Sequence, residues 1–268
     1  MTIPIVSAPV MRRLNVNGLD HLVRHYVAPD SKHPPVLVLH GFLDSGGTFD
    51  PVARALQAAG HEIFVPDLRG FGRTARIGAG GYYHFADYVT DVRCLLEVLN
   101  LGRAAVVGHS MGGGVASLFA GTFPDRVAKL ALLEGIGPMG EAPDQAVLRM
   151  RKHQADLARV DRKPRQVAST AEALERLALT HPRISPEALQ EQLQHLLAEG
   201  EDGALSWAWD PLHRTASATP FYSDAFASFL REIRCPTLFV SGGPSGWHPP
   251  EEEDRLALIS TLARRELP

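Results

Sequence analysis

One serine lies in a pattern typical of nucleophilic catalysis. Residues 108–112 read Gly-His-Ser-Met-Gly, which matches the spacing G-x-S-x-G, and Ser110 is the central residue. This spacing occurs where a strand turns sharply into a helix, with the serine hydroxyl projecting above a sheet. Glycines are needed on both sides because a side chain there would collide with the neighbouring strand or helix. The pattern therefore predicts that Ser110 is a nucleophile.

The segments on both sides of this serine support the interpretation. Residues 104–107, Ala-Ala-Val-Val, have no polar face, which is typical of a strand buried on both sides in a parallel sheet. Residues 113–119 are mostly small and are predicted to continue as a helix. The first N–H groups of such a helix are unpaired and lie at the positive end of its dipole, so they would stabilise an oxyanion beside Ser110. The alternative is a glycine-rich strand-to-helix connection with an incidental serine.

The composition describes an ordinary globular protein. The chain has 268 residues, of which 45% are hydrophobic and 21% are charged, so it can form one domain with an insertion or two domains. A formal charge of −3 gives no reason to expect nucleic acid or an anionic membrane as a partner. Two cysteines, Cys94 and Cys235, are expected to be free and buried, and neither has the spacing of a metal site.

No segment indicates targeting to a membrane. The first 15 residues lack the charged-then-apolar order of a secretory signal, and no window approaches the roughly 18 apolar residues that span a bilayer. We therefore expect a soluble cytoplasmic protein whose partner is a small-molecule substrate. No metal or cofactor is predicted, and the sequence gives no indication of the oligomeric state.

Strands alternate with helices along most of the chain, which predicts an α/β fold with a mainly parallel sheet flanked by helices. Two antiparallel strands are expected over 11–15 and 21–27, with Asn17-Gly18 as the turn between them. Buried strands are predicted over 36–39, 63–65, 104–107, 127–133 and 236–240. Helices are predicted over 51–59, 87–100, 113–119, 220–232 and from 249 to 262.

A change of composition marks an insertion between two of these strands. Residues from 141 to about 215 are rich in Gln, Arg, Glu, Ala and Leu and contain no strand signal. Ser169 and Glu172 have the spacing of a capping box, and Ser185-Pro186 is typical of a helix start. We predict a core formed by residues 1–136 and 216–268, and a helical cap formed by residues 137–215.

Several motifs in this order resemble the α/β-hydrolase superfamily. They are Leu-His-Gly-Phe at 39–42, Asp-Leu-Arg-Gly-Phe-Gly at 67–72, Gly-His-Ser-Met-Gly-Gly at 108–113 and Phe-Pro at 123–124. The resemblance implies an eight-stranded sheet with a cap inserted after the sixth strand. It also implies ester, amide, epoxide, carbon–halogen or carbon–carbon chemistry. Relatives that open epoxides or displace halide use an aspartate as the nucleophile, so Ser110 indicates an acyl-enzyme mechanism.

The resemblance also implies the residues around the nucleophile. The oxyanion hole would be formed by the backbone N–H groups of Phe42 and Met111. The usual place for the triad acid, after the seventh strand, contains no Asp or Glu over residues 241–248. The end of the sixth strand is the second known location, so Glu134 is predicted to be the triad acid. The alternatives are a structural role for Glu134 and another acid such as Asp224.

The resemblance places the catalytic histidine after an eighth strand, and the sequence contains no histidine at that place. We therefore expect the last strand and the catalytic base to be missing, which would leave residues 237–240 as an exposed apolar sheet edge. His248 is the best substitute by position, and His40, His109 and His213 are the other histidines expected near the active edge. His40, Trp209 and His248 are predicted to line the substrate pocket.

The sequence thus predicts a serine hydrolase that acts on a small ester or thioester through an acyl-enzyme. Without a base, this chain would have little or no activity. The alternatives are a non-catalytic ligand-binding protein, an acyltransferase and a carbon–carbon bond hydrolase on the same scaffold.

Overall fold

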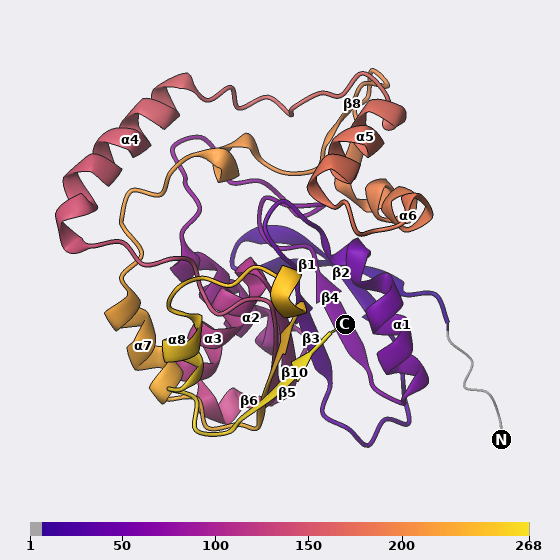
Figure 1. Cartoon of the computed structure of the whole chain (residues 1–268). Coiled ribbons are helices and arrows are strands. Elements are labelled where there is room, and N and C mark those ends of the chain that lie inside the picture. The colour runs from indigo at the N-terminus through magenta and orange to yellow at the C-terminus, as the bar shows by residue number, and fades with distance from the viewer. Residues whose placement is uncertain (1–6, 268) are drawn as a thin grey trace.

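An eight-stranded sheet forms the centre of the computed structural model, which describes residues 7–267 (Figure 1). The strands lie in the order β1-β2-β4-β3-β5-β6-β9-β10. Their bounds are β1 Val10–Val16, β2 Leu19–Tyr26, β3 Val36–Leu39, β4 Ile63–Pro66, β5 Ala104–His109, β6 Val127–Leu133, β9 Thr237–Ser241 and β10 Leu262–Glu266. Strand β2 is antiparallel to β1 and β4, and all other neighbours are parallel. The predicted α/β fold with a mainly parallel sheet is confirmed.

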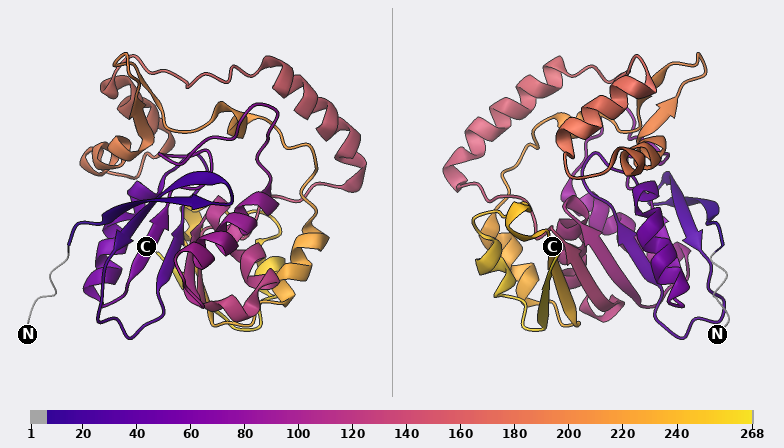
Figure 2. Two further views of the ribbon diagram at one scale, coloured as in Figure 1. Left: turned by 180° about the vertical axis from the view of Figure 1, so that it is seen from behind. Right: turned by 45° about the vertical axis from the view of Figure 1, so that its right-hand side comes forward.

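Helices cover both faces of this sheet (Figure 2). Their bounds are α1 Asp50–Ala58, α2 Phe85–Val98, α3 Met111–Thr122, α7 Ser223–Arg231 and α8 Glu252–Leu256. Successive side chains of a strand point to opposite faces, and β3 illustrates the result. Val36 and Val38 join the smaller cluster with α1, whereas Leu37 and Leu39 join the larger cluster with α2 and α3. This two-sided burial explains why the parallel strands read as continuous apolar runs.

The turn between β1 and β2 agrees with its sequence signal. Asn17 has a φ of 51° and Gly18 a φ of 78°, and Val16 pairs directly with Leu19. Two central residues with positive φ form the type of turn that matches the twist of a hairpin and favours Asn-Gly. The predicted hairpin is therefore confirmed.

The prediction that the last strand is missing is wrong. Helix α8 ends at Leu256, and β10 pairs in parallel with β9, from Leu262 opposite Thr237 to Glu266 opposite Ser241. Strand β9 is therefore covered on both sides and is not an exposed apolar edge. The sequence Leu-Ala-Arg-Arg-Glu of β10 lacks apolar alternation because four of its five residues are exposed at the end of the sheet. Charged residues on such an edge oppose pairing with another chain.

The cap lies between β6 and α7 and covers one end of the sheet (Figures 1 and 2). It contains α4 Ala146–Arg159, α5 Thr170–Thr180 and α6 Pro186–Leu196. Helix α5 begins as predicted, because the Ser169 hydroxyl accepts the Glu172 N–H at 3.1 Å. The expectation of a cap without strands is wrong, since β7 Leu197–Glu199 and β8 Leu205–Trp207 form a short antiparallel pair. A three-residue strand is too short to show a period in the sequence.

Short 3₁₀ helices complete the described elements. They are η1 Gly46–Phe49, η2 Pro124–Arg126, η3 Pro143–Gln145, η4 Pro211–Arg214 and η5 Gly243–Ser245. Both cysteines are free thiols; Cys235 is buried and Cys94 is half-buried. Within residues 7–267 we find no helix with the length and apolar character needed to cross a membrane. The same residues contain no cluster of three or more His, Cys, Asp or Glu side chains able to hold a metal ion.

Candidate active site

Ser110 lies at the sharp turn between β5 and α3, as predicted. Its φ of 49° and ψ of −114° are unusual for a residue with a side chain, and such a conformation costs of the order of 1–3 kcal/mol. The turn is held by the Ser110 N–H, which donates to the Leu133 carbonyl at 3.0 Å, and by the Gly113 N–H, which donates to the Ser110 carbonyl at 2.9 Å. The side chain of Ser110 is exposed to the cavities described below. The turn therefore presents the hydroxyl to a ligand.

Two backbone N–H groups beside this serine are free. Phe42 follows β3, and Met111 is the first residue of α3. Within residues 7–267 neither N–H has a protein acceptor. Unpaired backbone donors beside a nucleophile are able to stabilise the negative charge of an oxyanion. Phe42, Ser110 and Met111 line the same cavity, so a ligand there can reach all three.

A buried histidine holds the loop that carries Phe42. The Nε2 atom of His40 accepts the Leu68 N–H at 2.9 Å, so the proton lies on Nδ1, which donates to the Gly41 carbonyl at 2.8 Å. Burial lowers the pKa of His40, which keeps the ring neutral in this role. His40 is fully buried and lines neither cavity that contains Ser110, so its prediction as a pocket residue is wrong.

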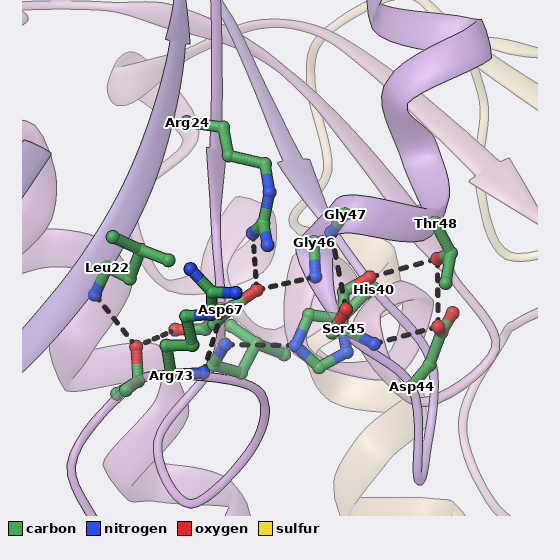
Figure 3. A network of polar contacts seen from close by, with 12 residues as sticks. Leu22, Arg24, His40, Asp44, Ser45, Gly46, Gly47, Thr48, Asp67 and Arg73 are labelled. Atoms are coloured by element: carbon green, nitrogen blue, oxygen red, sulfur yellow. Dashed lines mark hydrogen bonds and ion pairs between the residues drawn. The ribbon is translucent and has the colours of Figure 1, made fainter. Parts of the chain in front are cut away.

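A buried ion pair fixes the next part of the same loop (Figure 3). The Oδ1 atom of Asp67 accepts from Arg24 at 2.6 Å and from the Gly46 N–H at 2.8 Å. Its Oδ2 atom accepts the Arg73 N–H at 2.9 Å. Because Asp67 and Arg24 are both buried, removal of either would leave an unpaired charge in the interior. The motif at 67–72 therefore positions the loop after β3, a role that the sequence alone did not reveal.

Glu134 follows β6 and lies beside the loop after β9. Its Oε1 atom accepts the Gly242 N–H at 2.6 Å, and its φ is 45°. The carboxylate fits because Gly242 and Gly246 have no side chain; a Cβ atom at either position would overlap Oε1. Among the residues that the structure describes, Oε2 has no hydrogen-bond donor. One oxygen is thus fixed and the other is free, while Glu134 lines both cavities with Ser110.

None of the twelve histidines, which all lie within the described range, forms a hydrogen bond with Ser110 or Glu134. The ring of His248 contacts the Glu252 carboxylate at 2.8 Å and the Gly243 carbonyl at 2.7 Å instead. These two acceptors raise the pKa of His248. His248 lines neither cavity that contains Ser110, so its prediction as a pocket residue is also wrong.

Ser110 lies between two cavities. The first, of about 870 Å³, extends beneath the cap, and Trp209 is among its lining residues. The second, of about 650 Å³, extends along the start of α2 and residues 217–221. Phe42, Ser110, Glu134 and Trp247 line both cavities. A ligand bound at Ser110 can therefore extend in two directions, as the acyl and leaving groups of an ester do.

A neutral histidine in the wall of the second cavity makes stability depend on pH. His213 stacks between Phe71, at 3.8 Å between ring centroids, and Tyr83, at 3.9 Å. Burial lowers the pKa of His213 to about 3, well below the ordinary value of about 6.5. Below about pH 6 the unfolded chain binds a proton that the folded chain does not. Through this group alone, stability falls by about 1.4 kcal/mol per pH unit between about pH 6 and pH 3.

The exchange His213→Phe is expected to keep the ring stack and to remove this part of the pH dependence. Urea unfolding of the variant and of the wild type over this pH range measures the difference in slope. The same exchange at His33, whose side chain is exposed, is the matched control. Equal slopes for the wild type and His213→Phe would contradict the assignment.

Comparisons with known proteins agree with this architecture. Residues 34–245 match the family model described as the alpha/beta hydrolase fold. A serine hydrolase-like protein of Danio rerio is 31% identical over 173 residues, which cover 63% of this chain and 53% of that protein. The chain thus spans about half the length of this curated relative.

Two solved structures are similar over nearly the whole chain. A hypothetical protein from Pseudomonas aeruginosa has a TM-score of 0.84 at 28% identity, with 98% of this chain and 91% of that chain covered. The thioesterase domain from the curacin biosynthetic pathway has a TM-score of 0.83 at 25% identity, with coverages of 97% and 93%. On the match of the family model to most of its length, this chain belongs to the alpha/beta hydrolase family.

Proposed function

We propose that the chain is a serine hydrolase that acts on small esters or thioesters. The observation that carries the proposal is the turn at Ser110, with a φ of 49°, beside two cavities and two free N–H groups. The serine oxygen attacks the substrate carbonyl carbon, and the N–H groups of Phe42 and Met111 bind the oxygen that becomes negative. The serine proton passes to the leaving group, which departs as the alcohol or thiol, and water then cleaves the acyl-enzyme to give the acid and the free serine hydroxyl. A thioester is included because a similar solved structure is a thioesterase domain.

Glu134 is the acid of this proposal. A carboxylate that accepts the proton-bearing nitrogen of an imidazole orients the ring and stabilises its charged form. The Gly242 N–H fixes Oε1 of Glu134, which leaves Oε2 for that contact. The proton acceptor itself is not found among the hydrogen bonds of the described histidines. This observation favours a second candidate function, a protein that binds ligands in the capped cavities without catalysis.

A fluorophosphonate probe tests the proposal because it reacts with an activated serine; imidazole is added as the base, since no described histidine bonds to Ser110. It is expected to label the chain at Ser110, and Ser110→Ala is expected to abolish the label, as read by mass spectrometry of the peptide. Ser228→Ala, at an exposed serine of α7, is the matched control and is expected to retain the label. A wild type that stays unlabelled would overturn the hydrolase proposal and favour the ligand-binding function.

A further inference from the structure

Two arginines of the cap line the first cavity and have no acidic partner. Arg165 precedes the short pair of cap strands, and Arg214 is the last residue of η4. Both line the cavity of about 870 Å³ that contains Ser110. Within residues 7–267 neither guanidinium forms a hydrogen bond or an ion pair, although Arg214 lies over the Trp209 ring at 5.9 Å. Both residues are also exposed to solvent, and their two unpaired positive charges border the same cavity.

The other charged groups of this cavity already have partners. Arg176 pairs with Glu172 within α5. Asp44 accepts the N–H of the next residue at 2.7 Å and a threonine hydroxyl at 2.8 Å. Glu134 accepts a backbone N–H, as described above. The two unpaired arginines are thus the cationic side chains of this cavity that have no acidic partner in the described part of the chain.

Hydrogen bonds tie the two chain segments that carry these arginines. The Arg165 carbonyl accepts the Trp207 N–H at 3.0 Å, which ties the connection between α4 and α5 to β8. Asp210 caps η4 by accepting the Leu212 N–H at 3.0 Å, and it also accepts the Tyr83 hydroxyl at 2.8 Å. The segment that ends in Arg214 is therefore tied to the core. The fixed backbone removes part of the entropic cost of binding a ligand, while the exposed side chains still have to be ordered.

The two arginines lie where the first cavity borders another one. Together with Trp209 they also line a neighbouring cavity of about 760 Å³ that does not contain Ser110. The two arginines and Trp209 therefore lie on the side of the first cavity that borders this neighbouring cavity. The lining of the first cavity also includes apolar side chains, among them Leu177, Ile184 and Leu196.

We propose that Arg165 and Arg214 bind the anionic end of the substrate's acyl chain. A guanidinium matches a carboxylate by two parallel hydrogen bonds, whereas the apolar walls suit methylene groups. The preferred substrate is then an ester or thioester of an aliphatic dicarboxylic acid, with one carboxylate free. This inference rests on the proposed hydrolase function, because it places the other end of the chain at Ser110.

Ligand binding to a variant that cannot hydrolyse its substrate tests the inference separately from catalysis. All three tryptophans of the chain, Trp207, Trp209 and Trp247, line the first cavity, so their fluorescence reports on its contents. In the Ser110→Ala background, monomethyl adipate is expected to bind at least about tenfold more tightly than dimethyl adipate, its neutral analogue. The double exchange Arg165→Gln and Arg214→Gln is expected to abolish this preference.

A second double exchange separates local contacts from net charge. Arg151→Gln with Arg162→Gln removes the same charge from exposed residues of the cap outside the cavity, and it is expected to retain the preference. Equal binding of the two esters, or loss of the preference in both double variants, would overturn the inference. Charge reversal by Arg165→Glu is expected to make the neutral ester the better ligand.

The two proposals fail in different experiments. Preference for the monoanion without fluorophosphonate labelling would support the anion site and overturn the hydrolase. Labelling of Ser110 without the preference would support the hydrolase and overturn the anion site.

Discussion

Added imidazole is expected to raise the Ser110-dependent hydrolysis of a small nitrophenyl ester by at least about tenfold, because general base catalysis contributes typically 10²–10⁴. The nucleophile, the free N–H groups and the carboxylate lie around one place, whereas no histidine in the described chain bonds to Ser110. A serine without a base remains a weak nucleophile. Free imidazole is small enough for the cavity beside Ser110, and Oε2 of Glu134 is available to accept its N–H.

Steady-state rates at increasing imidazole concentration provide the measurement. Imidazole also cleaves such esters in solution, so the rate with Ser110→Ala is the background to subtract. Glu134→Gln is expected to weaken the response, because an amide stabilises the charged ring less than a carboxylate does. A fast Ser110-dependent rate that does not change with imidazole would show that the chain already supplies its base, and would contradict the prediction.

Gly112→Ala is expected to destabilise the fold by at least about 3 kcal/mol, which is the upper range for overpacking of a core. A Cβ atom at residue 112 would overlap the carbonyl oxygen of Leu39 and lie 2.6 Å from that of His40. Both are backbone atoms of the chain that leads to Phe42, so no side-chain rotation relieves the clash. The thermal unfolding midpoint should fall by about 10 °C in a chain of this size. Fluorophosphonate labelling of Ser110 should fall as well, because the Phe42 N–H would move.

Gly102→Ala is the matched control for this exchange. No atom lies within 4 Å of a Cβ built at Gly102, and its φ is not positive. Alanine should therefore be neutral or stabilise the fold by about 0.4–1 kcal/mol through the unfolded state. Calorimetry of both variants measures the difference. Equal midpoints for Gly112→Ala and the wild type would show that α3 does not pack against the end of β3 as described.

Local signals in the sequence predicted the parts of the fold that are buried or that need a special backbone. The apolar runs of β3 and β5 follow from burial of both faces, and Asn17-Gly18 follows from the positive φ of its turn. The predicted turn at Ser110 follows because only glycine fits at the closest approach of strand and helix. In each case one short segment contains the whole physical reason.

Elements whose pattern is set by distant neighbours could not be predicted. Strand β10 lies at the edge of the sheet and is mostly exposed, so its charged sequence carries no strand period. His248 follows the expected strand, yet Glu252 and Gly243 bind its ring away from Ser110. His40 lies in the expected loop, but both nitrogens of its ring form hydrogen bonds with backbone groups. Position along the chain did not reveal these partners.

The sequence by itself determined the type of nucleophile and the sheet that carries it, because apolar periodicity and glycine spacing are local properties. Only the tertiary structure brought Glu134 to Gly242, across 108 residues, and the two unpaired arginines of the cap to one wall. Hydrogen bonds and charge pairs are formed in space between segments that are remote along the chain. The presence or absence of a partner for each charged group is therefore decided by packing.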